Sequence, residues 1–291
     1  MLSHFPAYLC LQVKTRRMDA TYRKLLTYSY NIVGSYDDAK DLVQGVFEKY
    51  VAMDKGHIDH ETNYLIRTVI NASINFKNRQ ARHEGYGVWL PEPLATESAD
   101  FRLIKEQTAS YSLLVLMERL NARERAVFIL REAFGYSHEE VANVLNTSVE
   151  NSRQLLTRAR KAIGQVSVRA TRASREVLER YVQSIVDADI KGLEDLLLED
   201  IRLMADGGAS EKVIAGVIEG SSAAAKMLKR VYTLFLGSTR YTFTIVNHQP
   251  AICFYKGDVL YNCHVLDITA EGKISHIYSV VAPEKLQSCC F

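Results

Sequence analysis

Residues Ser137–Ile163 read SHEEVANVLNTSVENSRQLLTRARKAI, a stretch that predicts two helices joined by a tight turn. Ser137 stands three residues before Glu140, and Thr147 stands three residues before Glu150. A Ser or Thr followed three residues later by Glu forms the capping box with which many helices begin. Two such starts indicate a short first helix and a longer second one.

The predicted first helix covers His138–Leu145, the turn lies at Asn146, and the second helix covers Ser148–Ile163. Small and apolar side chains recur every three or four residues along the second helix: Val149, Ser152, Leu156, Ala159 and Ile163. This spacing predicts one buried face. Around the rest of the helix lie amide, hydroxyl and cationic side chains: Arg153, Gln154, Thr157, Arg158, Arg160 and Lys161.

A helix with this composition suits the major groove of DNA, because Gln and Arg can bond base edges and flanking Arg can neutralise phosphates. Residues 151–175 favour this interpretation, since they carry seven Lys or Arg and no Asp or Glu, in a chain of formal net charge +2. Such a block indicates an anionic partner. The alternatives are a solvated basic linker and an ordinary helical hairpin with a basic outer face.

The composition is that of a globular protein: of 291 residues, 47% are hydrophobic and 24% are charged. These values exclude a fibrous or wholly disordered chain, and the length suits about two domains. No window of about 18 residues is apolar and uncharged, so no membrane span is expected. The five cysteines lack metal-binding spacing. They indicate free thiols in a reducing compartment, the cytoplasm.

Two helical segments, from Asp19 to about Arg82 and from about Thr108 to Gly164, flank a stretch of different composition. Residues 84–105 hold glycines, prolines and acidic side chains, which is typical of a linker. Residues 1–17 are interpreted as a leader whose translation is in question, because Met18 immediately precedes the first clean helical pattern.

The C-terminal part begins with a long predicted helix, Ser174–Leu198, and then changes to short apolar and β-branched runs separated by turn signals. The predicted strands are Tyr241–Asn247, Ala251–Tyr255, Val259–Ile268 and Lys273–Val281. Runs of this kind predict a small antiparallel sheet. The chain is therefore expected to be all-helical first and α+β afterwards.

The predicted helix Tyr64–Arg82 has an unusual polar face without a carboxylate. Asn is a poor helix former, so several Asn on one face cost helix stability. Amide and guanidinium groups can bond unpaired bases and phosphates, which carboxylates would repel. The alternative is a neutral helix that packs against another element. The residues of this face are Tyr64, Arg67, Asn71, Asn75, Asn78, Arg79 and Arg82.

The segment Asp38–Phe47, DAKDLVQGVF, resembles the core-binding helix DAEDLVQEVF of the sigma-70 family, in its extracytoplasmic-function group. Residues Tyr64–Arg82 resemble the helix of that family that reads the −10 promoter element. Residues Leu120–Gly164 resemble the domain that reads the −35 element. The positions that depart from the family pattern are Lys40, Gly45 and Asn75.

The segment Trp89–Leu94, WLPEPL, resembles the linker motif of one subgroup, whose members carry a C-terminal SnoaL-like domain of the NTF2-like fold. Asp206–Gly208 resembles the start of that domain's DGGGK motif, and Asn247–Ala251 and Pro283–Leu286 fit its later parts. The resemblance implies a multidomain chain. Two all-α helical sigma domains, the second a helix-turn-helix, precede an α+β NTF2-like cone domain with a curved antiparallel sheet.

The implied function is that of a sigma factor, which binds the clamp of core RNA polymerase and directs promoter-specific transcription initiation under control in cis by the C-terminal domain. No catalytic residue, metal, cofactor or membrane contact is implied. The expected segments are the leader 1–17, sigma region 2 at 18–84, the linker 85–107, sigma region 4 at 108–165, the SnoaL-like domain 174–286 and the tail 287–291.

The resemblance also assigns residues to roles. The polar face of Tyr64–Arg82 is assigned to the −10 element, and the polar side chains of Ser148–Ile163 to the −35 element. Docking on core polymerase is assigned to Asp41, Gln44 and Phe47. Contacts between linker and C-terminal domain are assigned to Trp89, Leu90, Pro91, Glu92, Pro93, Asp206, Gly207 and Gly208. The alternative for the last three is a plain Gly-Gly turn.

Two other functions of the C-terminal domain stay open, because NTF2-like cones often enclose a pocket. It is either the sensor of an unidentified small-molecule ligand in a one-component DNA-binding regulator, or an isomerase or cyclase fused to a DNA-binding module. The candidate acid/base residues show no spacing that assembles a catalytic site, and we interpret them as surface, capping or strand-end residues: Asp187, Asp189, Asp206, Asp258, Asp267, His248, His264 and His276.

Overall fold

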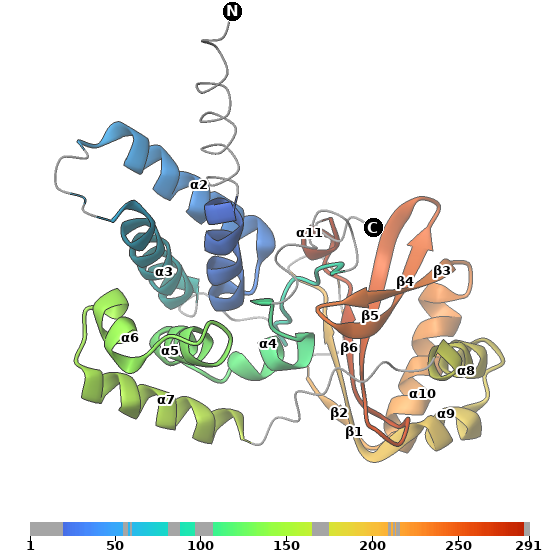
Figure 1. Ribbon diagram of the computed structural model, residues 1–291. Helices are drawn as coiled ribbons and strands as arrows, with labels where there is room; N and C mark the ends of the chain where they lie inside the picture. Colours follow the sequence, from blue (N-terminus) through green and yellow to red (C-terminus); the bar gives the residue numbers. More distant parts are fainter. Residues whose placement is uncertain are drawn as a thin grey trace, which may run out of the picture. The chain divides into compact units, whose positions relative to one another are not determined.

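The computed structural model describes residues 20–54, 58, 60–80, 88–96, 107–164, 175–208, 211, 213 and 216–287. The chain divides into two compact units, shown in Figure 1. The first comprises residues 1–83, 103–108 and 117–165, and the second comprises residues 84–102, 109–116 and 166–291. The predicted leader lies outside the described residues, as does the predicted tail after residue 287. Among the described residues, no helix is both long and apolar enough to cross a membrane.

The first unit is helical throughout its described residues. A helix at residues 20–33 is followed by α2 (Tyr36–Ala52), α3 (Glu61–Gln80), α5 (Ala122–Glu132), α6 (His138–Leu145) and α7 (Val149–Ile163). Ser35 caps α2 by accepting from the backbone N–H of Asp38, at 3.2 Å. The predicted helices therefore exist in this unit, with ends that differ from the predicted ones by a few residues at most.

The helix-turn-helix forms as predicted at its start and turn. Ser137 and Glu140 make a complete capping box, and Asn146 takes the left-handed conformation with φ of 48°. The second predicted capping box, Thr147 with Glu150, is wrong. The backbone N–H of Thr147 still donates to Ala142 O at the end of α6, so the cap of α7 moves one residue on to Ser148.

The described residues of the second unit form a six-stranded sheet that is covered on both faces. The strands are β1 (Leu197–Asp206), β2 (Ile218–Glu219), β3 (Arg240–Val246), β4 (Gln249–Lys256), β5 (Val259–Ile268) and β6 (Ile274–Val280), in the order β2-β1-β6-β5-β4-β3. All neighbouring pairs are antiparallel except β1 and β6, which run parallel. The antiparallel expectation therefore holds for the sheet with this one exception.

The predicted long helix Ser174–Leu198 is wrong, because the chain turns within it. α8 (Arg175–Val186) ends before Ala188, whose φ is 57°, and α9 (Ile190–Leu196) starts with Asp189 as its cap. The last residues of the predicted helix then enter β1. A run of Leu is compatible with a helix or with a buried strand, so periodicity alone did not separate the two.

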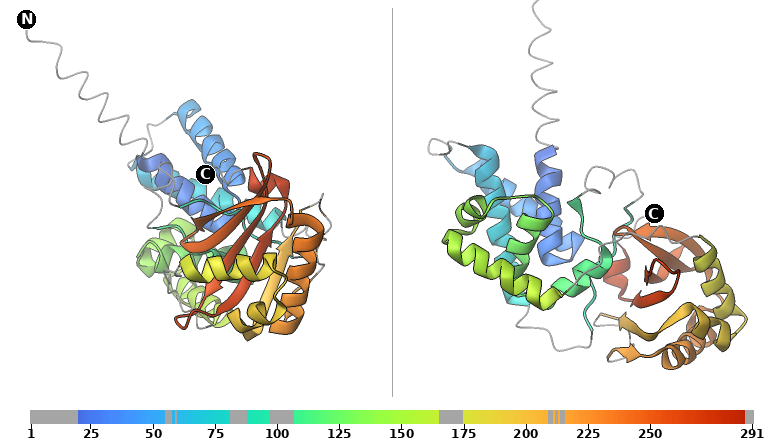
Figure 2. Two further views of the ribbon diagram at one scale, coloured as in Figure 1. Left: turned by 90° about the vertical axis from the view of Figure 1, so that its right-hand side faces the viewer. Right: turned by 60° about the horizontal axis from the view of Figure 1, so that its bottom comes forward.

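The sheet buries a different set of side chains on each face. One face packs against α8, α9 and α10 (Ser221–Val231), which lie along it in Figures 1 and 2. The core of that face includes Leu203, Phe254 and Leu266. The opposite face packs against the linker and α4 (Tyr111–Met117), with α11 (Pro283–Leu286) beside them. Its cluster includes Cys253, Cys263, Val265, Leu90 and Tyr111.

Candidate nucleic-acid interface and linker-binding site

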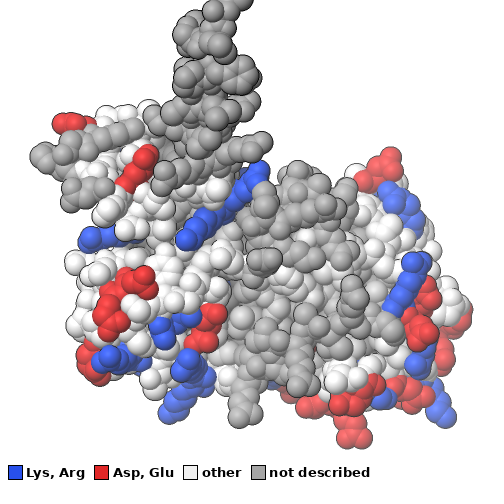
Figure 3. Space-filling view, in the orientation of Figure 1, with Lys and Arg blue, Asp and Glu red and all other residues white. Residues whose placement is uncertain are grey.

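The outer face of α7 is open to solvent. All six side chains assigned to the −35 element are exposed: Arg153, Gln154, Thr157, Arg158, Arg160 and Lys161. Three of the arginines form surface ion pairs with acidic neighbours. Arg153 and Arg158 lie 3.8 Å from their carboxylate partners, and Arg160 lies 2.6 Å from Glu132. Figure 3 accordingly shows basic and acidic side chains interspersed over this part of its visible face. Surface ion pairs of this kind contribute little and exchange readily for phosphate.

The inner face of α7 is fixed by packing on its neighbours in the helix-turn-helix. Ser152, Leu156, Ala159 and Ile163 are buried as predicted, and Leu155, which the predicted stripe omitted, is buried as well. The hydroxyl of Ser152 also lies 2.9 Å from Nδ1 of His138, at the start of α6. This broad buried face holds α7 at a defined angle, which a helix that reads base edges requires.

The polar face of α3 is only partly open. Arg67, Asn75, Asn78 and Arg79 are exposed, whereas Tyr64 and Asn71 are half-buried. Arg82 lies outside the described residues. The exposed members present amides and cations, and α3 itself adds no carboxylate to them, as the sequence predicts, although Glu140 of α6 lines the same groove as Arg67.

Part of this face lies against the helix-turn-helix inside the first unit. The side-chain amide of Asn71 donates to Val144 O in the last turn of α6, at 3.2 Å. A groove of about 400 Å³ has Tyr64 and Arg67 on one wall and Asn143 and Val144 on the other. Residues assigned to the −10 element therefore touch the domain assigned to the −35 element, which sequence reasoning missed.

A buried ionic cluster links α3 to α5 and to the helix at residues 20–33. Glu118 accepts from Lys77 on α3, at 2.7 Å, and from Arg125 on α5. Arg125 is fully buried, and its Nε donates to Asn31 O at 2.8 Å. Burial opposes the charged form of Glu118, yet the charges of Arg125 and Lys77 hold the pKa of this carboxyl below its usual value. The cluster joins three segments that are distant in sequence.

The residues assigned to polymerase docking lie on α2. Asp41 and Gln44 are exposed, and Phe47 is half-buried with its ring centroid 5.9 Å from that of Tyr22. Lys40, where the family pattern is acidic, pairs with Asp37 at 2.6 Å. The helix therefore offers two polar side chains and part of an aromatic ring on one accessible side.

The linker motif lies directly on the C-terminal sheet, within the second unit. The backbone N–H of Leu90 donates to Oδ2 of Asp206, at 2.7 Å. Lys285 donates to the same carboxylate at 2.5 Å and to Leu90 O at 2.6 Å. Its ammonium also lies 4.2 Å from the centroid of the Trp89 ring. Asp206 is 5% exposed, so these bonds form largely out of water.

A second set of bonds holds the other end of the motif. Pro91, Glu92 and Pro93 are buried, and Pro91 O accepts from the hydroxyl of Tyr111 at 2.7 Å. Leu94 N–H donates to Oδ1 of Asn247 at 2.8 Å, and Asn247 N–H donates back to Leu94 O at 2.9 Å.

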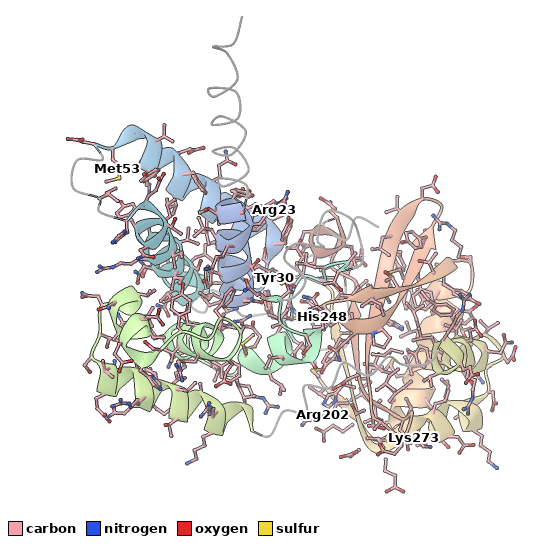
Figure 4. The ribbon with its side chains drawn as sticks, viewed as in Figure 1. Arg23, Tyr30, Met53, Arg202, His248 and Lys273 are labelled. Carbon is pink, nitrogen blue, oxygen red and sulfur yellow. The ribbon has the colours of Figure 1, made fainter. Side chains whose placement is uncertain are left out.

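Asn247 and His248 form the turn between β3 and β4, where Figure 4 labels His248. Their φ angles of 45° and 64° are those of a tight hairpin turn, which Asn adopts at low cost. Ala95 forms a bridge to Val246 next to this turn, so the linker extends the edge of the sheet.

The two glycines after Asp206 have little room for a side chain. A Cβ on Gly207 would collide with Glu211 O, and one on Gly208, whose φ is 61°, would collide with the carboxylate of Glu284. Gly208 N–H donates to Oδ1 of Asp206 at 2.8 Å. Neighbouring atoms therefore lie too close to either position for a side chain, which accounts for glycine at both. The segment is more than a plain turn. Asn247 and Lys285 stand in the segments that resemble the family, but sequence reasoning did not assign them to the linker.

Comparison with known proteins agrees with this architecture. Residues 110–163 match the family model described as Sigma-70, region 4. Two curated relatives from Mycobacterium tuberculosis are similar over much of their length. The sigma factor SigJ is 28% identical, covering 74% of this chain and 72% of its own, and the probable sigma factor SigI is 26% identical, covering 90% and 91%. The crystal structure of SigJ superposes with a TM-score of 0.74 at 22% identity, over 94% of this chain and 99% of that one.

Residues 110–163 therefore form a sigma-70 region 4 domain, and the chain as a whole is similar to sigma factors of the extracytoplasmic-function group. The superposition shows that the chain shares its fold with SigJ, with helical sigma domains followed by a C-terminal domain of the NTF2-like fold.

The candidate acid/base residues of the C-terminal domain do not converge on one point. Asp206 binds the linker, Asp189 caps α9, and Asp258 is exposed in a turn. Asp267 and His276 form a pair, with 3.7 Å between Oδ2 and Nδ1. Asp187 is exposed. His264 differs from the others, because it is 2% exposed and lines a cavity on the helix-covered face of the sheet.

His264 is expected to make stability depend on pH. Burial lowers its pKa to about 4 from 6.5, so the unfolded state binds more protons between these values. The free energy of unfolding should therefore fall as pH drops from 6.5 to 4, by up to about 3 kcal/mol for this residue. Urea unfolding at several pH values should show a steeper fall in the parent than in His264→Gln, and parallel curves would contradict the assignment.

Proposed function

We propose that this chain is a sigma factor that binds core RNA polymerase and directs promoter-specific transcription initiation, with its activity set in cis by the SnoaL-like domain. The observation that carries the proposal is the outer face of α7. It presents Gln, Thr, Arg and Lys side chains to solvent from a helix whose other side is buried in a helix-turn-helix. This arrangement matches what a recognition helix needs in a major groove.

The proposed contacts follow from the exposed side chains. Asp41, Gln44 and Phe47 on α2 dock on the clamp of the largest polymerase subunit. The polar face of α3, together with Arg82 beyond its described end, binds the unpaired −10 strand through amide and guanidinium groups. The outer face of α7 reads the −35 duplex. We assign no catalytic role to any residue, and the site of action is the cytoplasm, where polymerase and promoter meet.

The proposed control in cis acts through the linker. Asp206, Asn247 and Lys285 hold both ends of the WLPEPL motif against the sheet by backbone hydrogen bonds. Because the linker connects the segments assigned to −10 and −35 recognition, fixing its path restricts the distance those segments can adopt. The protein with its linker docked on the sheet would then differ in promoter activity from the protein with its linker released.

Run-off transcription with purified core polymerase tests the proposal, comparing the full chain with a version that ends at Gln165. The template carries the upstream region of the chain's own gene. A discrete transcript from either form supports sigma activity, and the ratio of the two forms gives the sign of control. If no transcript forms and the chain also fails to bind core polymerase in a pull-down from the same reaction, the proposal is wrong.

Two substitutions on α7 should separate phosphate contacts from base reading. Lys161→Ala should weaken −35 binding equally for all sequences and reduce the slope of log affinity against log salt by about 0.9. Gln154→Ala should instead relax discrimination between base pairs, with a loss of about 1–3 kcal/mol on the preferred sequence.

The measurement is fluorescence anisotropy of a labelled promoter with the reconstituted holoenzyme at several salt concentrations. Lys226→Ala is the control, because Lys226 is an exposed cation on α10, outside the proposed DNA surface. If it changed the slope as much as Lys161→Ala, α7 would have no special place in DNA binding.

A further inference from the structure

A cavity of about 340 Å³ lies in the second unit, on the helix-covered face of the sheet. Its walls are mainly apolar and come from β1, α10 and the segment after α10. Among the lining residues are Leu203, Met227, Val231, Leu234 and Phe235. Cavities of this size and composition are typical of small-molecule sites.

The floor of the cavity carries neutral polar groups. Asn262, His264 and Ser279 line it and are 2%, 2% and 7% exposed. Ser279 donates to Oδ1 of Asn262 at 3.1 Å, and Nδ1 of His264 lies 3.2 Å from the hydroxyl of Tyr181. Within the described part of the chain, these bonds leave Nδ2 of Asn262 and Nε2 of His264 without a protein partner. Both atoms can therefore bond a molecule inside the cavity.

The strand that supplies this floor is bulged at that point. Phe254 pairs with Asn262 and Tyr255 pairs with Leu260, so Tyr261 is an extra residue in β5. Consecutive residues of a regular strand face opposite sides, but both Tyr261 and Asn262 line the cavity. Bulges redirect side chains in this way and occur often beside functional sites.

The mouth of the cavity is formed by a rare backbone conformation. Residues Tyr232–Leu236 form a π-helical turn, η3, directly after α10. Leu234 and Phe235 are 60% and 50% exposed although both are large and apolar. A short π-helical segment is often a functional feature, and these two side chains present apolar surface at the entrance.

We propose that this cavity binds an uncharged, largely apolar small molecule that carries a hydrogen-bonding oxygen or nitrogen, which bonds Asn262 and His264. The apolar walls bury the body of such a ligand, and Asn262 Nδ2 donates to its polar atom. Burial raises the pKa of Tyr181 and lowers that of His264, so both groups stay neutral near pH 7.

The charges around the cavity exclude an ionic ligand from its interior. The cationic and anionic side chains that line it, Arg230 and Glu211, are both exposed at the rim and have opposite signs. An anion on the floor would lose hydration without gaining a cation. Among the described lining residues, Glu211 is the only carboxylate, so the site suits binding rather than proton abstraction.

This inference goes beyond sigma activity, and its test needs neither polymerase nor DNA, so either proposal can fail alone. The full chain is titrated with the uncharged naphthyl ketone dye Prodan, whose emission shifts to the blue in apolar sites. We expect saturable binding of one dye per chain and a rise in unfolding temperature with dye concentration. Asn262→Leu should weaken binding about tenfold through loss of the hydrogen bond.

Two further variants locate the dye. Val231→Trp fills the cavity and should abolish binding, and Leu234→Glu places a charge at its exposed mouth and should weaken binding without affecting folding. Val259→Glu is the control, because Val259 is a 70% exposed residue of β5 that does not line the cavity. Binding that survives both cavity variants would overturn the proposal. So would tighter binding of the anionic dye ANS than of Prodan that depended on Arg230.

Discussion

Asp206→Ala should lower the free energy of unfolding of the second unit by about 3–5 kcal/mol and release the linker from the sheet. The side chains of Asp206 and Lys285 are 6% and 11% exposed, so the variant leaves a largely buried ammonium without its carboxylate. It also removes the acceptor of the Leu90 N–H. Both losses fall on the same contact between linker and sheet.

Alkylation of individual cysteines, read by mass spectrometry, measures this release. Cys253 and Cys263 are fully buried in the cluster that contains Leu90 and Tyr111, with 3.8 Å between their sulfur atoms. They should react much faster in Asp206→Ala, and hydrogen exchange along β1 and β6 should accelerate.

Asp258→Ala is the matched control, because Asp258 is fully exposed and makes only a surface pair with Arg240. Equal cysteine protection in Asp206→Ala and the parent chain would contradict the role of the carboxylate. Run-off transcription with the same variants then shows whether linker release raises or lowers promoter activity.

Glu118→Gln should destabilise the first unit by about 3–5 kcal/mol, because it removes the carboxylate with which both Arg125 and Lys77 pair in a buried cluster. Arg125 is fully buried and Lys77 is 7% exposed, so neither can recover full hydration by a small movement. The lowered pKa of Glu118 also makes the stability of the first unit depend on pH. Its stabilising contribution is present above the unfolded-state pKa and is lost as pH falls through the folded-state value.

Urea unfolding followed by hydrogen exchange on α3 and α5 measures this loss. Glu132→Gln is the control, since Glu132 pairs with Arg160 at the exposed surface and should change stability by less than about 1 kcal/mol. Similar losses in both variants would show that burial does not distinguish the two ion pairs. A loosened first unit should also free Asn71 from Val144, which hydrogen exchange at the end of α6 would report.

Local patterns in the sequence predicted much of the fold. The capping box at Ser137 predicted the start of α6, and apolar residues spaced by three or four predicted α7, because these signals act over one or two turns of helix. The same reasoning failed at Ser174–Leu198, where a turn at Ala188 needs a backbone conformation that no Gly announces. β1 was missed because its parallel partner, β6, lies some 70 residues later in the chain.

In the candidate site too, the features set by local sequence could be predicted, and those set by contacts between distant residues could not. The exposed face of α7 could be predicted, since solvent exposure follows from the buried stripe on the other side. The bonds from Asn71 to Val144 and from Glu118 to Lys77 join residues far apart in sequence, and no local signal encodes them. The link between Trp89–Leu94 and Asp206 was foreseen only through the family resemblance.

The alternation of side chains along β5 limits which insertions and deletions this domain can tolerate during evolution. Cys263 and Val265 face the linker, while Asn262 and His264 face the cavity. Deleting one residue from the middle of the strand would exchange the two sets, presenting amide and imidazole to the linker and thiol to the cavity. Length variation among descendants of this gene should therefore be confined to turns such as 256–258. Within the strand after the bulge, substitutions at odd-numbered positions should be limited by packing against the linker. Substitutions at even-numbered positions should be limited by the cavity and its ligand.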